Sequence, residues 1–308
     1  MGEWSKKVGE RGEELIGDFL KSIGWGSAQR GLELDCARSE KHKVGGKNRH
    51  THGIDYLFPH RCPLIDELFQ NIVISVKYSA EPYPSNPSTK FKEHFIDLTG
   101  TLECFRNSTL RRDAIASKHG VRETQDIGVL FWLSNAKNSY DDVVGRLQNI
   151  NVPDDNNYRA VHLVDNKRMA FIYDALAFVR QIRDAQFQFH YHESGRNLNP
   201  LVNSKNGQVL PVEFITSPVI ALRVEIPGSN DVRLMLLLDE PFDGDSLRRM
   251  IGLAQRLSGN WTRRIDICFS EFNTLEHDNE VQAVKNGFED RQVIDAITVT
   301  SFRPSFTT

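Results

Sequence analysis

Around residue 55 the chain reads His52-Gly53-Ile54-Asp55-Tyr56-Leu57-Phe58, and soon afterwards it reads Asn71-Ile72-Val73-Ile74-Ser75-Val76-Lys77-Tyr78. Both segments are rich in β-branched and aromatic residues and are bounded by turn-forming residues, which predicts two β-strands. An Asp near the start of one strand and a Lys near the end of its neighbour can meet at one edge of a sheet. A carboxylate there can hold a divalent cation, and an ammonium can orient water or a phosphate. These two groups are the minimum needed for metal-dependent cleavage of a phosphodiester.

The bulk properties are those of a soluble globular protein. The 308 residues allow a hydrophobic core and two domains, and 39% of them are hydrophobic and 26% charged. No apolar run reaches the length of a membrane span, and the N-terminus lacks the apolar segment of a signal peptide. The four cysteines are widely scattered, at Cys36, Cys62, Cys104 and Cys268. We therefore expect reduced thiols in a cytoplasmic protein with no membrane contact.

Charge is distributed unevenly although the net charge is only −3. Cations gather between residues 30 and 52, at Arg30, Arg38, Lys41, Lys43, Lys47 and Arg49, with histidines at 42, 50 and 52. A basic loop beside a carboxylate site suits a polyanionic substrate, so Lys43, Lys47, Arg49 and His52 are predicted to bind it. The alternatives are a solvated loop and, for His52, an imidazole packed at the end of its strand.

The first part of the chain is expected to run α-β-β-β-α-β. Helical periodicity covers residues 5–23, and Gly24 ends it. Short strands are predicted at 32–37, 54–58, 71–78 and 127–133, with a loop at 38–50 and a helix over 89–118. A helix at 139–149, a strand pair within 160–172 and a helix at 173–183 complete this domain, whose predicted limits are 1–183.

A second α/β domain is expected over residues 184–308. Strands are predicted near 187–191, 209–214, 219–226, 233–238, 264–269 and 294–302, and a helix at 245–257. No catalytic pattern is evident there, so this domain is expected to serve substrate selection or subunit contact. The whole chain also lacks a phosphate-binding loop ending in Gly-Lys-Ser/Thr, which argues against nucleotide hydrolysis by that route.

Four residues form the candidate catalytic set: Glu13, Asp55, Ser75 and Lys77. Glu13 lies on a helix that can pack across the end of the strand bearing Asp55. Carboxylate oxygens are the ligands of a hard cation such as Mg²⁺, which polarises a phosphoryl oxygen and acidifies water. Three of them also have an ordinary interpretation: Glu13 as a solvated helix residue, Asp55 as a strand-start Asp bonded to the backbone, and Lys77 as a strand-end Lys.

The set resembles a known nuclease core. Gly9-Glu10-Arg11-Gly12-Glu13-Glu14 is similar to the first helix of the PD-(D/E)xK nuclease superfamily, Gly53-Ile54-Asp55 to its central Asp, and Ile74-Ser75-Val76-Lys77 to its (D/E)-x-K strand. A narrower resemblance rests on three segments, Gly2-Glu3-Trp4-Ser5-Lys6-Lys7-Val8-Gly9-Glu10, His52-Gly53-Ile54-Asp55-Tyr56 and Val76-Lys77-Tyr78-Ser79. In these segments the chain resembles the nuclease subunit of a two-gene bacterial anti-phage defence system, the GAPS group. The resemblance implies a restriction-endonuclease-like αβββαβ fold, DNA cleavage with Mg²⁺, and a second protein subunit as partner in a hetero-oligomer.

One position departs from the family pattern, because Ser75 stands where the family has a carboxylate. A hydroxyl is a weaker, neutral ligand, and Glu14, Glu93 or Asp97 can supply the missing charge. The backbone carbonyl of Val76 is a further predicted metal ligand, with Glu13 and Asp55. The alternative function is a catalytically inert nucleic-acid-binding or sensor subunit of a defence complex.

A zinc set is a separate possibility, with His50 and His52 as one pair of ligands and His60 and Cys62 as the other. Two pairs of nitrogen and sulfur ligands can close a tetrahedral site. Only one residue separates the members of each pair, however, and Asp55 lies between the pairs. We therefore do not expect zinc at these four residues.

Overall fold

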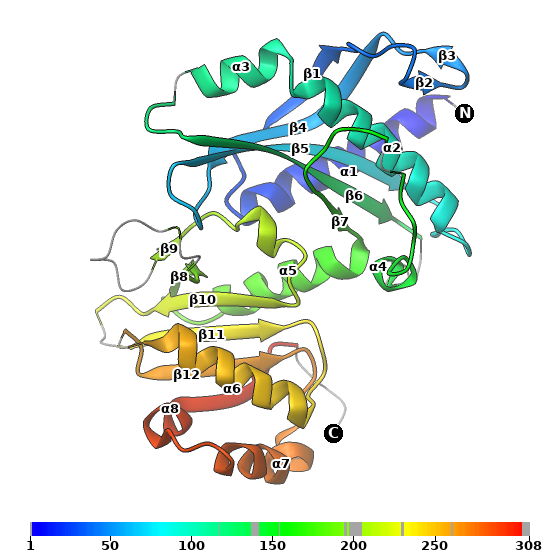
Figure 1. Cartoon of the computed structure of the whole chain (residues 1–308). Helices are drawn as coiled ribbons and strands as arrows, with labels where there is room; N and C mark the ends of the chain where they lie inside the picture. Colours follow the sequence, from blue (N-terminus) through cyan, green and yellow to red (C-terminus); the bar gives the residue numbers. More distant parts are fainter. Residues whose placement is uncertain are drawn as a thin grey trace. The chain divides into compact units, whose positions relative to one another are not determined.

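The computed structural model describes residues 2–116, 118–136, 142–153, 155–193, 196, 205–228, 231–259 and 261–303. The chain divides into two compact units, residues 1–169 and residues 170–308. Figure 1 shows the order of their elements along the chain. None of the described helices combines the length and the apolarity that crossing a membrane requires.

A five-stranded sheet in the order β1-β4-β5-β6-β7 is the framework of the first unit. Its strands are β1 (Gln29–Asp35), β4 (Thr51–Arg61), β5 (Leu68–Ser79), β6 (Glu123–Ser134) and β7 (Val161–Val164). The pairs β1–β4 and β4–β5 are antiparallel, whereas β5–β6 and β6–β7 are parallel. The central strands β5 and β6 are continuously buried over much of their length, since both faces of the sheet are covered.

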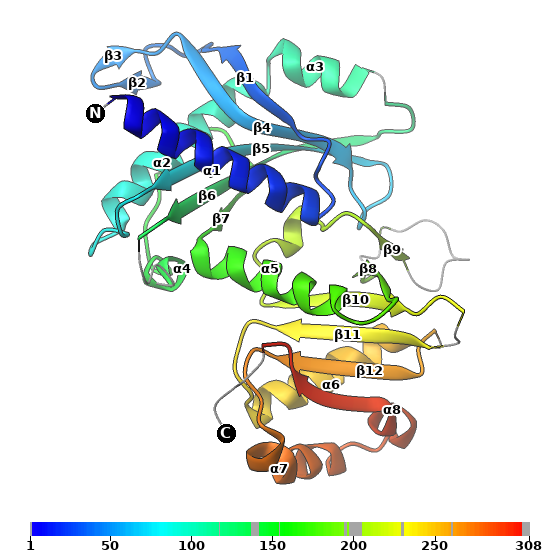
Figure 2. The ribbon, with the colours of Figure 1, turned by 180° about the vertical axis from the view of Figure 1, so that it is seen from behind.

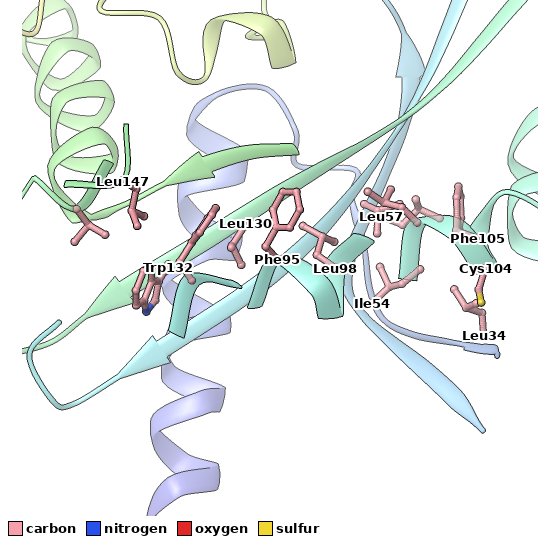
Figure 3. Close-up of a cluster of buried hydrophobic side chains, with 14 of the residues drawn as sticks. Leu34, Ile54, Leu57, Phe95, Leu98, Cys104, Phe105, Leu130, Trp132 and Leu147 are labelled. Carbon is pink, nitrogen blue, oxygen red and sulfur yellow. The ribbon is translucent and has the colours of Figure 1, made fainter. Parts of the chain in front are cut away.

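Two helices cover the opposite faces of this sheet, α1 (Gly2–Ser22) on one and α2 (Ser88–Phe105) on the other (Figures 1 and 2). Phe19 of α1 packs edge-on against Phe131 of β6, with 5.8 Å between ring centroids. On the other face, Phe95 and Leu98 of α2 lie against β6, where Leu130 and Trp132 project toward them (Figure 3). Strand β6 is therefore covered by a helix on each face of the sheet.

Smaller elements complete the first unit. They are β2 (Lys43–Val44), β3 (Lys47–Asn48), α3 (Thr109–Ala116) and α4 (Val143–Arg146). β2 and β3 form a hairpin whose two turn residues, Gly45 and Gly46, both have positive φ, at 58° and 79°. Glycine adopts that conformation without steric cost, which is why two glycines favour this tight turn.

The second unit has its own sheet, in the order β13-β12-β11-β10-β8-β9. The strands are β8 (Gln186–Tyr191), β9 (Lys205–Gly207), β10 (Val219–Glu225), β11 (Val232–Leu238), β12 (Arg264–Phe269) and β13 (Ile297–Ser301). The helices are α6 (Gly244–Ser258), α7 (Thr274–Asn286) and α8 (Arg291–Ala296), with a 3₁₀ turn at Val212–Phe214. The helix α5 (Asn166–Arg180) contains the boundary between the two units.

The predicted fold class is confirmed, because the first unit runs α-β-β-β-α-β along its main elements and a further α/β region follows. Several local predictions were wrong. Residues 38–50 contain the β2–β3 hairpin, and the strand pair within 160–172 is one strand followed by α5. Asp165 explains the second error, since its Oδ1 accepts the backbone N–H of Arg168 at 2.9 Å and so starts a helix there.

Other helices also differ from their predicted limits. The helix over 89–118 is two helices, α2 and α3, separated at residues 106–108, and residues 209–214 hold a 3₁₀ turn where a strand was expected. The predicted helix 139–149 retains only Val143–Arg146, and its first part, 139–141, lies outside the described residues. Helices α7 and α8 were not predicted, and α8 occupies the expected start of the last strand. The predicted domain boundary after 183 stays a prediction.

Candidate active site

The site is centred on a fork between β4 and β5. The register between these strands ends at the pair Tyr56–Ile74, after which β4 pairs with β1 and β5 continues with β6. Asp55 stands at the point of separation. Its Oδ2 accepts the backbone N–H of Val76 at 2.6 Å, so the carboxylate bridges the two diverging strands.

Asp55 lies in a crowded electrostatic environment. Burial raises the pKa of its carboxyl group, and the nearby negative charges of Glu13 and Asp97 act in the same direction. The N–H of Val76 and the ammonium of Lys77 act in the opposite direction without cancelling the effect. The carboxylates of this region therefore repel one another, and a bound dication would relieve that repulsion.

Glu13 approaches the fork from α1. Its Oε2 accepts two hydrogen bonds from Arg30, from Nε at 3.0 Å and from Nη2 at 2.9 Å. The Tyr56 hydroxyl donates to the backbone carbonyl of Glu13 at 2.6 Å, which fixes α1 against β4. The Arg30 side chain is 46% exposed and that of Glu13 32%, so their ion pair is a partly solvated one of small stabilising effect.

Lys77 is held by a carboxylate of the opposite helix. Its Nζ lies 2.9 Å from Asp97 Oδ2 on α2, and Arg49 Nη1 lies 2.5 Å from Asp97 Oδ1. Burial acts to raise the pKa of Asp97, but the two cations outweigh it and the pKa is lowered. Asp97 thus orients Lys77 and also ties the basic segment before β4 to the site.

Replacing Asp97 by Asn is expected to destabilise the protein by about 1–3 kcal/mol at pH 7, because two partly buried cations would lose their counter-ion. A carboxyl with a lowered pKa contributes stability above its unfolded pKa and loses that contribution as pH falls through the folded pKa. The difference in unfolding free energy between wild type and Asp97→Asn should therefore be largest near neutral pH and shrink in acid. Urea denaturation at several pH values measures it.

A matched control is Asp113→Asn, since Asp113 is an exposed carboxylate on α3. Its unfolding free energy should stay within about 0.5 kcal/mol of wild type at every pH. If the difference in unfolding free energy between wild type and Asp97→Asn is the same at pH 7 and pH 3, the assignment of this ion pair is contradicted.

A cavity of about 440 Å³ adjoins the fork. Its lining includes Glu13, Val76, Lys77, Glu81, His94 and Trp132. Burial, together with the charges of Lys77 and Lys90, lowers the pKa of His94 to about 4, so its imidazole is neutral at physiological pH. The cavity therefore combines two carboxylates, the ammonium groups of Lys77 and Lys90, and a neutral imidazole.

Sequence reasoning missed Glu81 and His94 as functional candidates. Glu81 lies in the proline-containing loop after β5, and its side chain is exposed. The signal was its position four residues after Lys77, on the loop that follows β5. His94 gave no such signal, because its imidazole reaches the cavity only through the packing of α2 against Trp132, with 5.5 Å between ring centroids.

Ser75 lies on β5 opposite Leu130 of β6 and is half-buried. Of the three acids considered as replacements for the missing carboxylate, Glu93 pairs with Lys90 in solvent at 2.8 Å. Glu14 is exposed and lines a different cavity. Asp97 is the acid that contacts Lys77, and Glu81 is a further carboxylate facing the same cavity as Glu13.

The predicted substrate-binding residues fall into different environments. Lys43 and Lys47 are exposed on the β2–β3 hairpin. Arg49 is bound to Asp97, with a side chain only 20% exposed. His52 is completely buried, and its ring contacts His42 and Thr101, so it cannot reach a bound polyanion in this conformation. The burial of His52 agrees instead with the alternative of an imidazole packed at the end of its strand.

The donors at the fork suit a hard divalent cation. Glu13 and Asp55 supply carboxylate oxygens, and the main chain of Val76 lies beside them. Oxygen ligands of this kind are those that Mg²⁺ prefers, and the repulsion around Asp55 favours a cation there. Within the described residues, the carboxylates of Glu13 and Asp55 and the ammonium of Lys77 therefore lie near one another beside a cavity.

Comparison with known families agrees with this geometry. Residues 1–168 match the model of the GAPS4 protein PD-(D/E)XK nuclease domain. No curated protein and no solved structure gives a significant match. PD-(D/E)XK nucleases in general use divalent metal ions, commonly Mg²⁺. Since the match covers more than half of the 308 residues, the chain belongs to the family defined by the GAPS4 PD-(D/E)XK nuclease domain.

Proposed function

We propose that the chain is an Mg²⁺-dependent DNA nuclease that acts in bacterial anti-phage defence as one subunit of a cytoplasmic hetero-oligomer. The observation that carries the proposal is the fork between β4 and β5, where Asp55 binds the Val76 N–H next to Lys77. Glu13 of α1 lines the same cavity as Val76 and Lys77. Family membership supports the nuclease assignment.

Each residue has a defined role in this proposal. Glu13, Asp55 and the Val76 carbonyl would hold Mg²⁺, which when bound polarises the scissile phosphate and lowers the pKa of a water ligand. Lys77 would orient the attacking water and stabilise charge on the phosphate, and Asp97 would position Lys77. Ser75 would contribute a neutral hydroxyl, and Glu81, which lines the same cavity as Glu13 and Lys77, would supply a further carboxylate.

The test is a cleavage assay on the chain purified with its partner subunit. Supercoiled plasmid DNA should be cut with Mg²⁺ and left intact when EDTA exceeds the metal, because the carboxylates alone cannot activate water. An RNA substrate of equal length, run in parallel, should remain uncut. Metal-independent cleavage, or preferential cleavage of RNA, would contradict the proposal.

The exposed β2–β3 hairpin is proposed to contact the DNA backbone. Reversing its charges in the double variant Lys43→Glu/Lys47→Glu should weaken DNA binding by about tenfold or more. The slope of log K against log salt should also fall by about 2, because two phosphate contacts are lost. Fluorescence anisotropy at several salt concentrations measures both quantities.

The control for the hairpin variant makes the same change in charge elsewhere in the first unit, in Arg112→Glu/Arg122→Glu, whose residues are both exposed. Its DNA affinity should stay within about twofold of wild type if the effect is local to the hairpin. Equal weakening by both double variants would assign the effect to overall charge and remove the hairpin from the proposed interface.

A second function remains supported by one observation, the neutral Ser75 in place of the family carboxylate. It is that of a catalytically inert nucleic-acid-binding or sensor subunit. In that case the chain would bind DNA in the presence of EDTA and show no cleavage with Mg²⁺ and the partner present. For either function we propose that residues 184–308 serve substrate selection or contact with the partner subunit.

A further inference from the structure

Four metal-ligating side chains from four separate segments meet inside the first unit, outside the fork. Cys36 directly follows β1, His42 lies in the loop before β2, His52 is on β4 and Cys104 is in the last turn of α2. Their donor atoms all lie within 4.8 Å of one another. His42, His52 and Cys104 are buried, with 8%, 0% and 2% exposure, and Figure 3 shows Cys104 beside the apolar cluster of the first unit.

Four of the six distances between these donors match those of a tetrahedral zinc site, and all six lie within 4.8 Å. Zn–S bonds of about 2.3 Å and Zn–N bonds of about 2.05 Å give tetrahedral edges of about 3.8 Å (S···S), 3.6 Å (S···N) and 3.3 Å (N···N). The corresponding distances are 3.9 Å from Cys104 Sγ to Cys36 Sγ and 3.5 Å from each sulfur to His42 Nδ1. His42 Nδ1 lies 3.3 Å from His52 Nε2.

Hydrogen bonds on the outer side of each imidazole fix which nitrogen faces inward with a lone pair. The Thr101 hydroxyl donates to the Asp97 carbonyl at 2.9 Å, so at 3.2 Å it accepts from His52 Nδ1–H. His42 Nε2 lies 3.0 Å from the Glu103 carboxylate, which can only accept, so His42 donates there. In the neutral imidazoles, His42 Nδ1 and His52 Nε2 therefore direct lone pairs at each other.

Two facing lone pairs at 3.3 Å repel unless a cation lies between them. Zinc between these nitrogens and two thiolates has no net charge, which suits a buried position. The outer hydrogen bonds to Glu103 and Thr101 are of the kind that orient metal-bound histidines. A disulfide is a poorer account, since it uses neither histidine and requires the sulfurs to approach to about 2.05 Å.

We propose that Cys36, His42, His52 and Cys104 bind a structural Zn²⁺ ion. All four coordination positions come from the protein, so this zinc has no open position for a substrate and is distinct from the Mg²⁺ of the fork. Its ligands tie the segment 36–52, which includes the exposed hairpin, to α2 and β4. The ion would therefore hold the hairpin, and the strand that bears Asp55, in fixed relation to the first unit.

The backbone around the proposed ligands is already arranged for this role. The N–H of Cys36 donates to the His50 carbonyl at 2.7 Å, and the N–H groups of Lys41 and His42 both donate to the Arg38 carbonyl at 2.9 Å. These bonds close the segment between the first two ligands into a compact turn. Main-chain hydrogen bonds therefore hold Cys36 and His42, the first two proposed ligands, in place.

The first experiment measures the metal content of the full chain, purified without added metal, by inductively coupled plasma mass spectrometry. About one zinc per chain is expected in wild type, and less than about 0.2 in Cys104→Ser and His52→Ala. Cys268→Ala, which removes a buried cysteine of the second unit, and Asp55→Asn, which alters the fork, should both retain about one zinc. Equal zinc contents in all five proteins would overturn the proposal.

The second experiment avoids reliance on variants that fold poorly. Wild type is stripped with a chelator under reducing conditions and titrated with Co²⁺. Tetrahedral coordination by two thiolates should produce intense visible d–d bands and a near-ultraviolet thiolate-to-metal band that saturate at about one equivalent and disappear on adding Zn²⁺. Millimolar Mg²⁺ should leave the bands unchanged. No such bands, or a Cys36–Cys104 disulfide found by mass spectrometry in the freshly isolated protein, would refute the site.

Discussion

Changing Asp55 to Asn is expected to reduce the rate of DNA cleavage by about 100- to 1000-fold. The asparagine side chain has the same shape, and its amide oxygen can still accept the Val76 N–H that Asp55 Oδ2 accepts at 2.6 Å. The fork should therefore keep its geometry while it loses the carboxylate that we propose as a metal ligand. Initial rates of plasmid nicking over a range of Mg²⁺ concentrations measure the loss, and higher Mg²⁺ should restore part of the rate.

The matched control is Asp18→Asn. Asp18 lies on α1, like Glu13, but forms an exposed ion pair with Lys21. Its nicking rate should equal that of wild type within about twofold. Thermal unfolding of both variants verifies that they remain folded. If Asp55→Asn cuts at the wild-type rate, Asp55 is not a metal ligand and the proposed mechanism fails.

Changing Gly12 to Ala is expected to reduce both stability and cleavage. A Cβ at position 12 would collide with the Cβ and the first ring atom of Tyr78 on β5. Because the Tyr78 Cβ is attached to the strand backbone, α1 must move away from the sheet, and Glu13 moves with it. We expect the unfolding free energy to fall by about 1–3 kcal/mol and cleavage to fall at least about tenfold.

Gly9→Ala provides the matched control, since Gly9 lies on the same helix and a Cβ there meets nothing within 4 Å. In a helix interior, alanine is favoured over glycine by about 0.5–1 kcal/mol, so Gly9→Ala should be slightly more stable than wild type. Chemical denaturation of the two variants side by side separates helix propensity from the close approach to Tyr78. Equal stabilisation by both substitutions would show that α1 and β5 are not in close contact at position 12.

The sequence was sufficient for those parts of the fold in which local patterns and tertiary packing agree. The periodicity of residues 5–23 and the β-branched segments around Asp55 and Ser75 predicted α1, β4 and β5, because each buries the face that its pattern makes apolar. The pairing of Asp55 with the Val76 N–H was not predictable, since it depends on where the ladder between β4 and β5 ends.

Other features depend on contacts between residues far apart in the chain. Asp97 contacts Lys77 and Arg49 because α2 packs across the sheet near both residues. From the sequence alone, Arg49 was predicted to bind substrate. Cys104 approaches Cys36 to 3.9 Å across a long separation in sequence. The spacing of the cysteines in the sequence therefore did not indicate that Cys36 and Cys104 lie close together. The zinc pairs considered from the sequence included neither of these two residues.

The fork between β4 and β5 constrains the length of the segment that connects these two strands, residues 62–67. Side chains alternate between the two faces of a sheet. A shift of β5 by one residue relative to β4 would therefore place Lys77 on the opposite face and turn its ammonium away from Asp97. Residues 62–67 set this alignment although none of them belongs to the proposed catalytic set. The chain should therefore tolerate changes of residue type in that connection far better than a single insertion or deletion.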